Sequence, residues 1–167
     1  MEVERANLSD PTAVRGTSSV PLASIRILVA DAFEPWRRSV RSMLKGHPKL
    51  RVVGEAADGL TALQRASALK PDLVLLAIDL PNLNGIEVAR RIRQVVPGTR
   101  IVFLTLEGEA DVVQAALDTG AQGYVVKTGA GSELYPAIEA VLQGEQYVSS
   151  GVVGYSDSSR HLQIVLN

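Results

Sequence analysis

The sequence has no cysteine in its 167 residues. Disulfide bonds and thiolate metal sites are therefore excluded, and a reducing compartment is compatible with the chain. No apolar run approaches the roughly 18 residues that a membrane span requires. The beginning of the chain also lacks the apolar segment of a secretory signal. We therefore expect a soluble, cytoplasmic protein that has no membrane partner.

Net charge is almost absent as well. Lys plus Arg total 17 and Asp plus Glu total 18, which gives a formal charge of -1 at pH 7. A strongly basic chain would be drawn to nucleic acid or to an anionic membrane, and this balance predicts neither. The arginines at 37, 38 and 41 share one predicted helix. We expect them to form a solvated charged face.

The most informative stretch of the chain is apolar from Leu73 to Ile78 and is followed by Asp79 and Pro81. Six apolar residues between turn residues are typical of a strand that is buried on both faces, as in the middle of a parallel sheet. Such a sheet places its binding chemistry just beyond the carboxyl ends of its strands. At that point this chain has Ala77.

Hydrophobic periodicity predicts that strands and helices alternate along the chain. The expected strands are 25–30, 50–56, 73–78, 100–105 and 122–126, and the expected helices begin near residues 35, 60, 86, 110 and 133. This alternation predicts an α/β fold of the flavodoxin-like (βα)5 type, with a doubly wound, five-stranded parallel sheet in the order 2-1-3-4-5.

Domain boundaries follow from composition. Residues 1–23 are polar and interrupted by proline and glycine, so we expect a disordered leader. The folded domain is predicted to span 24–148. Residues 149–167 are expected to form a tail that is flexible or docked, with flexibility favoured by serines such as Ser149 and Ser150. The segment 161–166 (HLQIVL) could add a short strand, cover an apolar patch or be disordered.

Several motifs agree in order and spacing with one known family. They are IRILVAD at 25–31, VVGEAADGLTAL at 52–63, PDLVLLAIDLPNLNGIEVARRIR at 71–93, IVFLT at 101–105 and GAQGYVVK at 120–127. Together they resemble the receiver domain of bacterial two-component response regulators, a CheY-like domain, and in particular its LuxR/NarL type. The resemblance implies a phosphorylation switch. In this switch a partner kinase phosphorylates an Asp at the end of the third strand, next to Mg²⁺ held by acidic residues.

The acidic positions implied by this resemblance are only partly kept. Ala77 stands at the phosphoacceptor position. Asp31 matches the first of two acidic residues after the first strand, whereas Ala32 replaces the second and Phe33 replaces a commonly polar neighbour. Asp79 lies where the family uses a backbone carbonyl as a metal ligand. An acyl phosphate requires a carboxylate nucleophile, and alanine has none.

The switch positions implied by the resemblance are kept. Thr105 matches the Thr or Ser and Lys127 the Lys that contact the phosphoryl group, and Tyr124 matches the aromatic residue that changes rotamer. Each has a simpler interpretation. Thr105 could be a strand-end residue that caps a loop, and Lys127 a member of a structural ion pair. Tyr124 could bind a partner or be a half-buried sheet residue with its hydroxyl in water.

We expect the Mg²⁺ site to be lost and no cofactor to be bound, because Mg²⁺ is usually held by one or two carboxylates plus phosphate. If a metal did bind, its ligands would be Asp31 and Asp79. The side chains of Asp31 and Lys127 could instead pair across the crevice, directly or through water. Such a pair would fix the pocket in one state without adding much stability, since desolvation offsets the attraction.

The leading interpretation is a stand-alone, atypical receiver, or pseudo-receiver, that is not an enzyme and acts by protein–protein interaction. Its expected partner is a kinase, another response regulator or an output protein. Formation of a homodimer is a further alternative. We expect no helix-turn-helix in the tail and no direct binding of nucleic acid. Two alternatives remain: a receiver that is phosphorylated on Asp79 or carries an engineered Ala77, and a flavodoxin-like protein that binds a small ligand.

Overall fold

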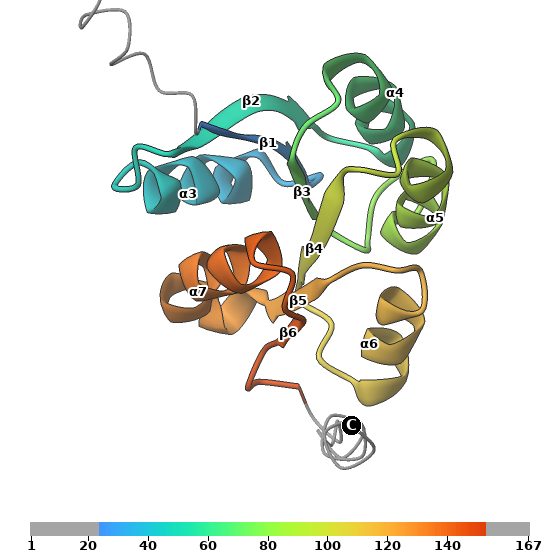
Figure 1. Ribbon diagram of the computed structural model, residues 1–167. Coiled ribbons are helices and arrows are strands. Elements are labelled where there is room, and N and C mark those ends of the chain that lie inside the picture. Colours follow the sequence, from blue (N-terminus) through green and yellow to red (C-terminus); the bar gives the residue numbers. More distant parts are fainter. Residues whose placement is uncertain (1–23, 153–167) are drawn as a thin grey trace, which may run out of the picture.

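The structure is a computed structural model that describes residues 24–152, so the predictions for 1–23 and 161–166 lie outside the described residues. Figure 1 shows one sheet with helices on both faces. The strands are β1 (Ile25–Ala30), β2 (Leu50–Ala56), β3 (Leu73–Leu76), β4 (Arg100–Thr105), β5 (Gly123–Val126) and β6 (Tyr147–Val148). The helices are α3 (Glu34–Leu44), α4 (Gly59–Leu69), α5 (Gly85–Val95), α6 (Ala110–Leu117) and α7 (Ala130–Leu142), with a 3-10 turn, η1 (Lys127–Gly129). None of these helices is long and apolar enough to cross a membrane.

The strand order β2-β1-β3-β4-β5-β6 confirms the predicted order of the first five strands, and all neighbours are parallel. The prediction of a five-stranded sheet is wrong, because β6 pairs with the outer edge of β5. The backbone N–H of Tyr147 donates to the carbonyl of Gln122 at 3.0 Å, and that of Ser149 to the carbonyl of Tyr124 at 2.8 Å. A two-residue strand shows no alternation of apolar residues, so no periodicity indicated it.

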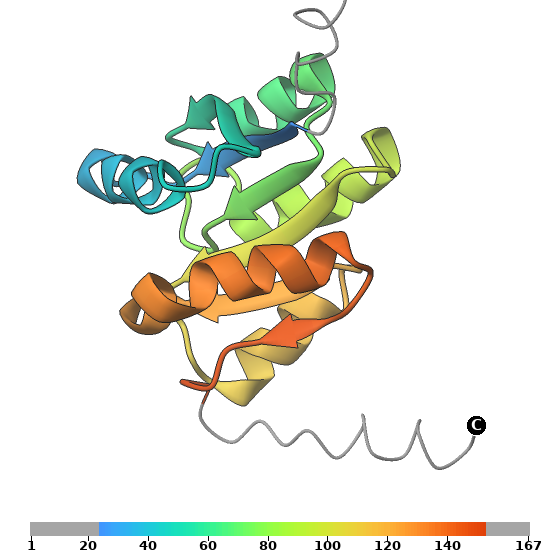
Figure 2. The same ribbon diagram turned by 60° about the vertical axis from the view of Figure 1, so that its left-hand side comes forward.

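Two apolar layers cover the sheet, with α3 and α7 on one face and α4, α5 and α6 on the other (Figures 1 and 2). Residues of β3 alternate between these layers. Leu73 and Leu75 belong to the layer of α3 and α7, whereas Val74 and Leu76 belong to the opposite layer. This double burial explains why the central strand is a continuous apolar run rather than an alternating one.

The central strand ends at Leu76, two residues earlier than the predicted end at Ile78. Ala77 still donates its N–H to the carbonyl of Ala30 at 3.0 Å, but the carbonyl of Ile78 accepts from Gly85 at 2.7 Å and from Leu80 at 2.9 Å. The chain turns at Ile78 because local hydrogen bonds of the following loop replace those of the sheet. Apolar composition alone does not mark that point.

Gly85 allows the loop after β3 to close over Ala77. A Cβ atom on Gly85 would lie 2.0 Å from the carbonyl oxygen of Ala77, closer than any real contact. The backbone of Ala77 is therefore held between β1 and the start of α5. Because residue 85 has no side chain, the start of α5 can lie directly against Ala77.

Replacement of Gly85 by alanine should lower the free energy of unfolding by about 1–3 kcal/mol, since the backbone around Ala77 must shift. Gly131 is a matched control, because it also lies in the first turn of a helix but nothing lies within 4 Å of the position that a Cβ atom would take there. Gly131→Ala should raise the free energy of unfolding by about 0.5 kcal/mol. Urea unfolding of both variants measures these changes, and equal effects would contradict the close approach at Gly85.

The last helix begins earlier than predicted. We expected it to start near residue 133, with Pro136 in its first turn, but η1 follows β5 directly and α7 begins at Ala130. Pro136 therefore lies inside the helix. Burial of Ala130 and Leu134 against the sheet stabilises the first turn of α7, and this tertiary contact outweighs the local effect of proline.

The tail was expected to be flexible or docked, and Ser149 and Ser150 are docked, because Glu133 of α7 holds both. The hydroxyls of Ser149 and Ser150 and the backbone N–H of Ser150 donate to its carboxylate. Partial burial alone would raise the pKa of Glu133, but these hydrogen bonds together outweigh it and lower the pKa below its usual 4.5. The carboxylate thus fastens the residues after β6 to α7.

This contact should depend on pH in a defined direction. Because the folded pKa of Glu133 is lowered, its contribution to stability is fully present above the unfolded value of 4.5 and is lost as the pH falls through the folded pKa. Amide resonances of Ser149 and Ser150 should therefore shift together in acid. In Glu133→Gln they should lack this titration, and an unchanged titration in that variant would contradict the assignment.

Candidate functional site

A pocket of about 230 Å³ lies at the carboxyl ends of β1, β3, β4 and β5. It brings together six of the seven acidic, acceptor and switch positions that the sequence singled out. These six are Asp31, Ala32, Ala77, Asp79, Thr105 and Lys127. Phe33, Leu106 and Glu107 complete its lining. The carboxyl edge of this sheet is therefore the place where the predicted site residues meet.

An ion pair between Asp31 and Lys127 spans this pocket. Lys127 Nζ lies 2.6 Å from Asp31 Oδ2, and the side chains of Lys127 and Asp31 are 14% and 6% exposed. Asp31 follows β1 and Lys127 follows β5, so the contact crosses the ends of β3 and β4. The direct pairing expected for these two residues is present. Within the described residues Oδ2 accepts no hydrogen bond, so the contact with Lys127 is an ion pair.

Further contacts orient both partners of the ion pair. The backbone N–H of Phe33 donates to Asp31 Oδ1 at 2.9 Å. Lys127 Nζ also lies 5.1 Å from the centroid of the Trp36 ring, within the range of a cation–π interaction. Trp36 was not among the site residues expected from the sequence, so its contact with the ammonium group is a finding of the structure.

The oxygen atoms in this pocket do not fit Mg²⁺. The carboxylate of Asp31 is engaged by Phe33 and Lys127, while Ala32 and Ala77 have no side-chain oxygen. Asp79 is exposed on the loop beyond the strand. Within residues 24–152 no group of three or more His, Asp or Glu side chains is placed to hold a metal ion. Near-octahedral oxygen ligation would require rearrangement of the ion pair.

Thr105 and Tyr124 differ in their access to the pocket. Thr105 ends β4, is 3% exposed, and accepts a long hydrogen bond of 3.4 Å from the N–H of Ile78. Tyr124 is fully buried, and its hydroxyl donates to the carbonyl of Glu107 at 2.7 Å. The expectation of a half-buried residue with its hydroxyl in water is therefore wrong for Tyr124, whereas partner binding by Tyr124 stays a prediction. Burial raises the pKa of Tyr124 strongly, and the charge of Glu107 raises it further.

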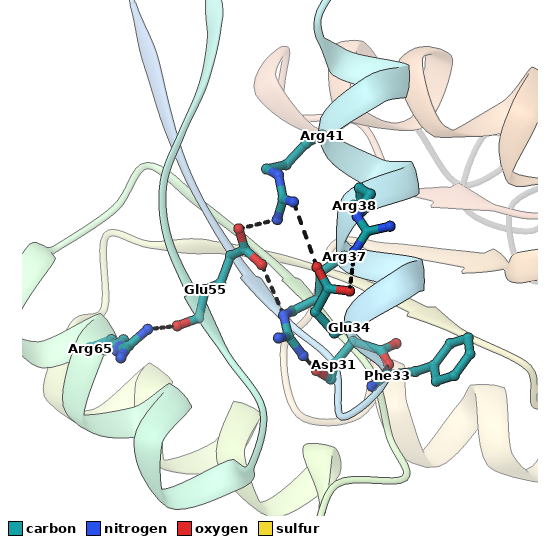
Figure 3. A network of polar contacts seen from close by, with 8 residues as sticks. All are labelled: Asp31, Phe33, Glu34, Arg37, Arg38, Arg41, Glu55 and Arg65. Atoms are coloured by element: carbon teal, nitrogen blue, oxygen red, sulfur yellow. Dashed lines mark hydrogen bonds and ion pairs between the residues drawn. The ribbon is translucent and has the colours of Figure 1, made fainter.

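A network of arginines and glutamates supports the pocket from the side of α3. Figure 3 shows its members, which are Asp31, Phe33, Glu34, Arg37, Arg38, Arg41, Glu55 and Arg65. Arg37 Nε lies 2.9 Å from Glu55 Oε1, and Arg37 Nη1 donates to the carbonyl of Asp31 at 2.6 Å. Arg41 pairs with Glu55 as well. The predicted solvated face is thus wrong for Arg37, whose side chain is only 14% exposed.

Comparison with known proteins agrees with this geometry. Residues 27–139 match the model of the response regulator receiver domain. The chain belongs to this family. Its sequence is 32% identical over 130 residues to the transcriptional regulatory protein LiaR of Bacillus subtilis, a match that covers 78% of this chain and 62% of LiaR. The chain therefore spans less than two thirds of the length of this relative.

Solved structures of receivers share the fold. A two-component response regulator of the LuxR family from Aurantimonas sp. superimposes with a TM-score of 0.76 at 33% identity, covering 82% of this chain and 98% of that chain. A protein-glutamate methylesterase/protein-glutamine glutaminase of Alkalilimnicola ehrlichii is 39% identical over 105 residues, which is 62% of this chain and 27% of that protein. The similarity to the methylesterase thus concerns a minor part of that enzyme.

The chain is a receiver domain with relatives of the LuxR/NarL type.

The ion pair gives a testable prediction about stability. Lys127→Met should lower the free energy of unfolding by roughly 3 kcal/mol, because it leaves the buried carboxylate of Asp31 without its partner. The double variant Asp31→Asn/Lys127→Met removes both charges and should lose less than about 1.5 kcal/mol. Urea unfolding at pH 7 measures both. A double variant as unstable as Lys127→Met would show that the charges are not coupled.

Proposed function

We propose that the chain is a pseudo-receiver of a two-component system, which passes its signal by protein contact and without phosphorylation of an aspartate. The observation that carries this proposal is the methyl group of Ala77 on the floor of a pocket whose buried carboxylate already pairs with Lys127. An acyl phosphate forms on a carboxylate, and residue 77 provides none. No cofactor is needed for such a role.

The charge of the pocket supports this proposal. Carboxylates at residues 31, 32 and 77 would repel one another and would need a cation for balance. With alanine at 32 and 77, Asp31 and Lys127 neutralise each other. A ligand shifts a conformational equilibrium only through different affinities for its states. Without a phosphoryl group, Thr105 and Tyr124 have no ligand that would drive such a shift, so the domain rests in one state.

The proposed partner is another signalling protein, either a kinase, a response regulator or an output protein, and a homodimer is a further option. The proposed contact surface includes α6, the edge at β5, and α7, by analogy with signalling in this family. Since β6 covers the outer edge of β5, a partner would contact side chains of β6 there rather than the free backbone of β5. Glu55 pairs with Arg37 and Arg41 of α3 within the chain, which agrees with a protein partner rather than nucleic acid.

Phosphorylation on Asp79 is the second candidate, and it has one observation in its favour. Asp79 lines the same pocket and is exposed. A small ligand is less well supported at this pocket, because its volume of about 230 Å³ is below the roughly 300–1,000 Å³ typical of ligand sites.

Incubation of the full chain with acetyl phosphate and Mg²⁺ tests these candidates by intact mass. The chain should gain no phosphoryl group, and the double variant Ala32→Asp/Ala77→Asp should gain one, because it restores the nucleophile and a metal ligand. Uptake by the unchanged chain would overturn the proposal. If that uptake disappeared in Asp79→Asn, Asp79 would be the acceptor.

A further inference from the structure

Two large apolar side chains flank the mouth of the pocket and are exposed to solvent. Phe33 is 62% and Leu106 69% exposed, the highest values among the large apolar residues of the described chain. They lie on different loops, after β1 and after β4, yet both line the same pocket. The other exposed residues of this kind, Leu60 and Val95, do not line it.

The position of Phe33 is unfavourable for the local fold. Phe33 is the N-cap residue of α3, and no side chain caps this helix. Ser, Thr, Asp or Asn at an N-cap accepts a hydrogen bond from the first turn, which phenylalanine cannot do. In Figure 3 the ring points away from the network around Glu55. A residue that neither caps its helix nor packs in the core has its apolar surface available to another molecule.

The loop that carries Leu106 is held in place by a hydrogen bond from the buried side chain of Tyr124. Leu106 lies between Thr105, which ends β4, and Glu107, whose carbonyl accepts the hydrogen bond from the buried hydroxyl of Tyr124. On the other side, Phe33 is tied to Asp31 through its backbone N–H. Both apolar side chains therefore project from anchored backbone, which lowers the entropic cost of binding.

The charges around the mouth specify the chemistry of a partner. The lining has three carboxylates, Asp31, Asp79 and Glu107, and one ammonium group, Lys127, which leaves a net charge of -2. Asp31 and Lys127 neutralise each other inside the pocket, so the excess negative charge belongs to the exposed Asp79 and Glu107. Two apolar side chains and two carboxylates around one pocket are complementary to an apolar group next to a cation.

We infer that Phe33 and Leu106 form a docking surface for a protein segment that places an aliphatic or aromatic side chain beside a Lys or Arg. The apolar side chain would pack between Phe33 and Leu106, and the cation would face Asp79 and Glu107. This inference rests on the proposed function, since it assigns the pocket mouth to contact rather than to phosphoryl transfer. It adds a surface separate from the one at α6, β5 and α7.

A displayed library of random 12-residue peptides, selected on the full chain, tests the inference. Selected peptides should combine an apolar residue with a neighbouring Lys or Arg. Their affinity should fall at least tenfold in Phe33→Ser and in Leu106→Ser, a loss typical of residues at the centre of an interface. Serine caps helices, so Phe33→Ser should also unfold at a higher urea concentration, which separates lost binding from lost folding.

Two controls make the result decisive. Val95, at the end of α5 and 56% exposed, is a matched apolar residue outside the pocket, and Val95→Ser should leave the affinity within twofold. Asp79→Asn/Glu107→Gln should weaken binding and reduce its dependence on salt. Selection of no peptides, of acidic peptides, or of peptides that bind Phe33→Ser equally well would overturn the inference. Phosphoryl uptake is measured in a separate experiment. Uptake would overturn the proposed function, whereas peptide binding alone decides whether Phe33 and Leu106 form a docking surface.

Discussion

The ion pair between Asp31 and Lys127 is the interaction on which the pocket depends. It joins the ends of β1 and β5 across the two strands between them, with the ammonium group 2.6 Å from the carboxylate. Because residues 32 and 77 are alanines, this one contact balances the buried charge without a metal ion. Desolvation offsets much of the Coulomb attraction in such a pair, so its main consequence is a fixed geometry rather than high stability.

Residues around the ion pair also fix the geometry of the pocket. Arg37 connects the carbonyl of Asp31 to Glu55, and Trp36 lies beside the ammonium group of Lys127. Gly85 lets α5 close over Ala77, and Tyr124 holds the loop after β4 through the carbonyl of Glu107. A rigid floor with apolar residues around its mouth suits recognition by contact, which needs preorganised surface more than it needs a reactive group.

The sequence was sufficient for the parts of the fold that depend on long apolar patterns. The buried run at β3 and the alternation of strands and helices led to the observed order of five strands, and residues at strand ends led to six of the pocket residues. Features that depend on tertiary contacts were missed. Strand β6 has two residues, the hydrogen bonds of Ser149 and Ser150 require Glu133 far away in the sequence, and burial of Tyr124 depends on the carbonyl of Glu107. The exposure of Phe33 and Leu106 likewise follows from loop geometry. Their apolar character alone would have assigned these two side chains to the core.

We propose that this receiver holds one state in which Lys127 neutralises Asp31 and leaves no place for Mg²⁺. Titration of the ¹⁵N-labelled full chain with MgCl₂, followed through the Lys127 ammonium and the Thr105 and Tyr124 amide resonances, tests it most directly. We expect these resonances to keep their positions apart from small salt effects that do not saturate. A saturable shift of all three at millimolar Mg²⁺ would contradict it, because it would show a metal ion displacing the ammonium group from Asp31.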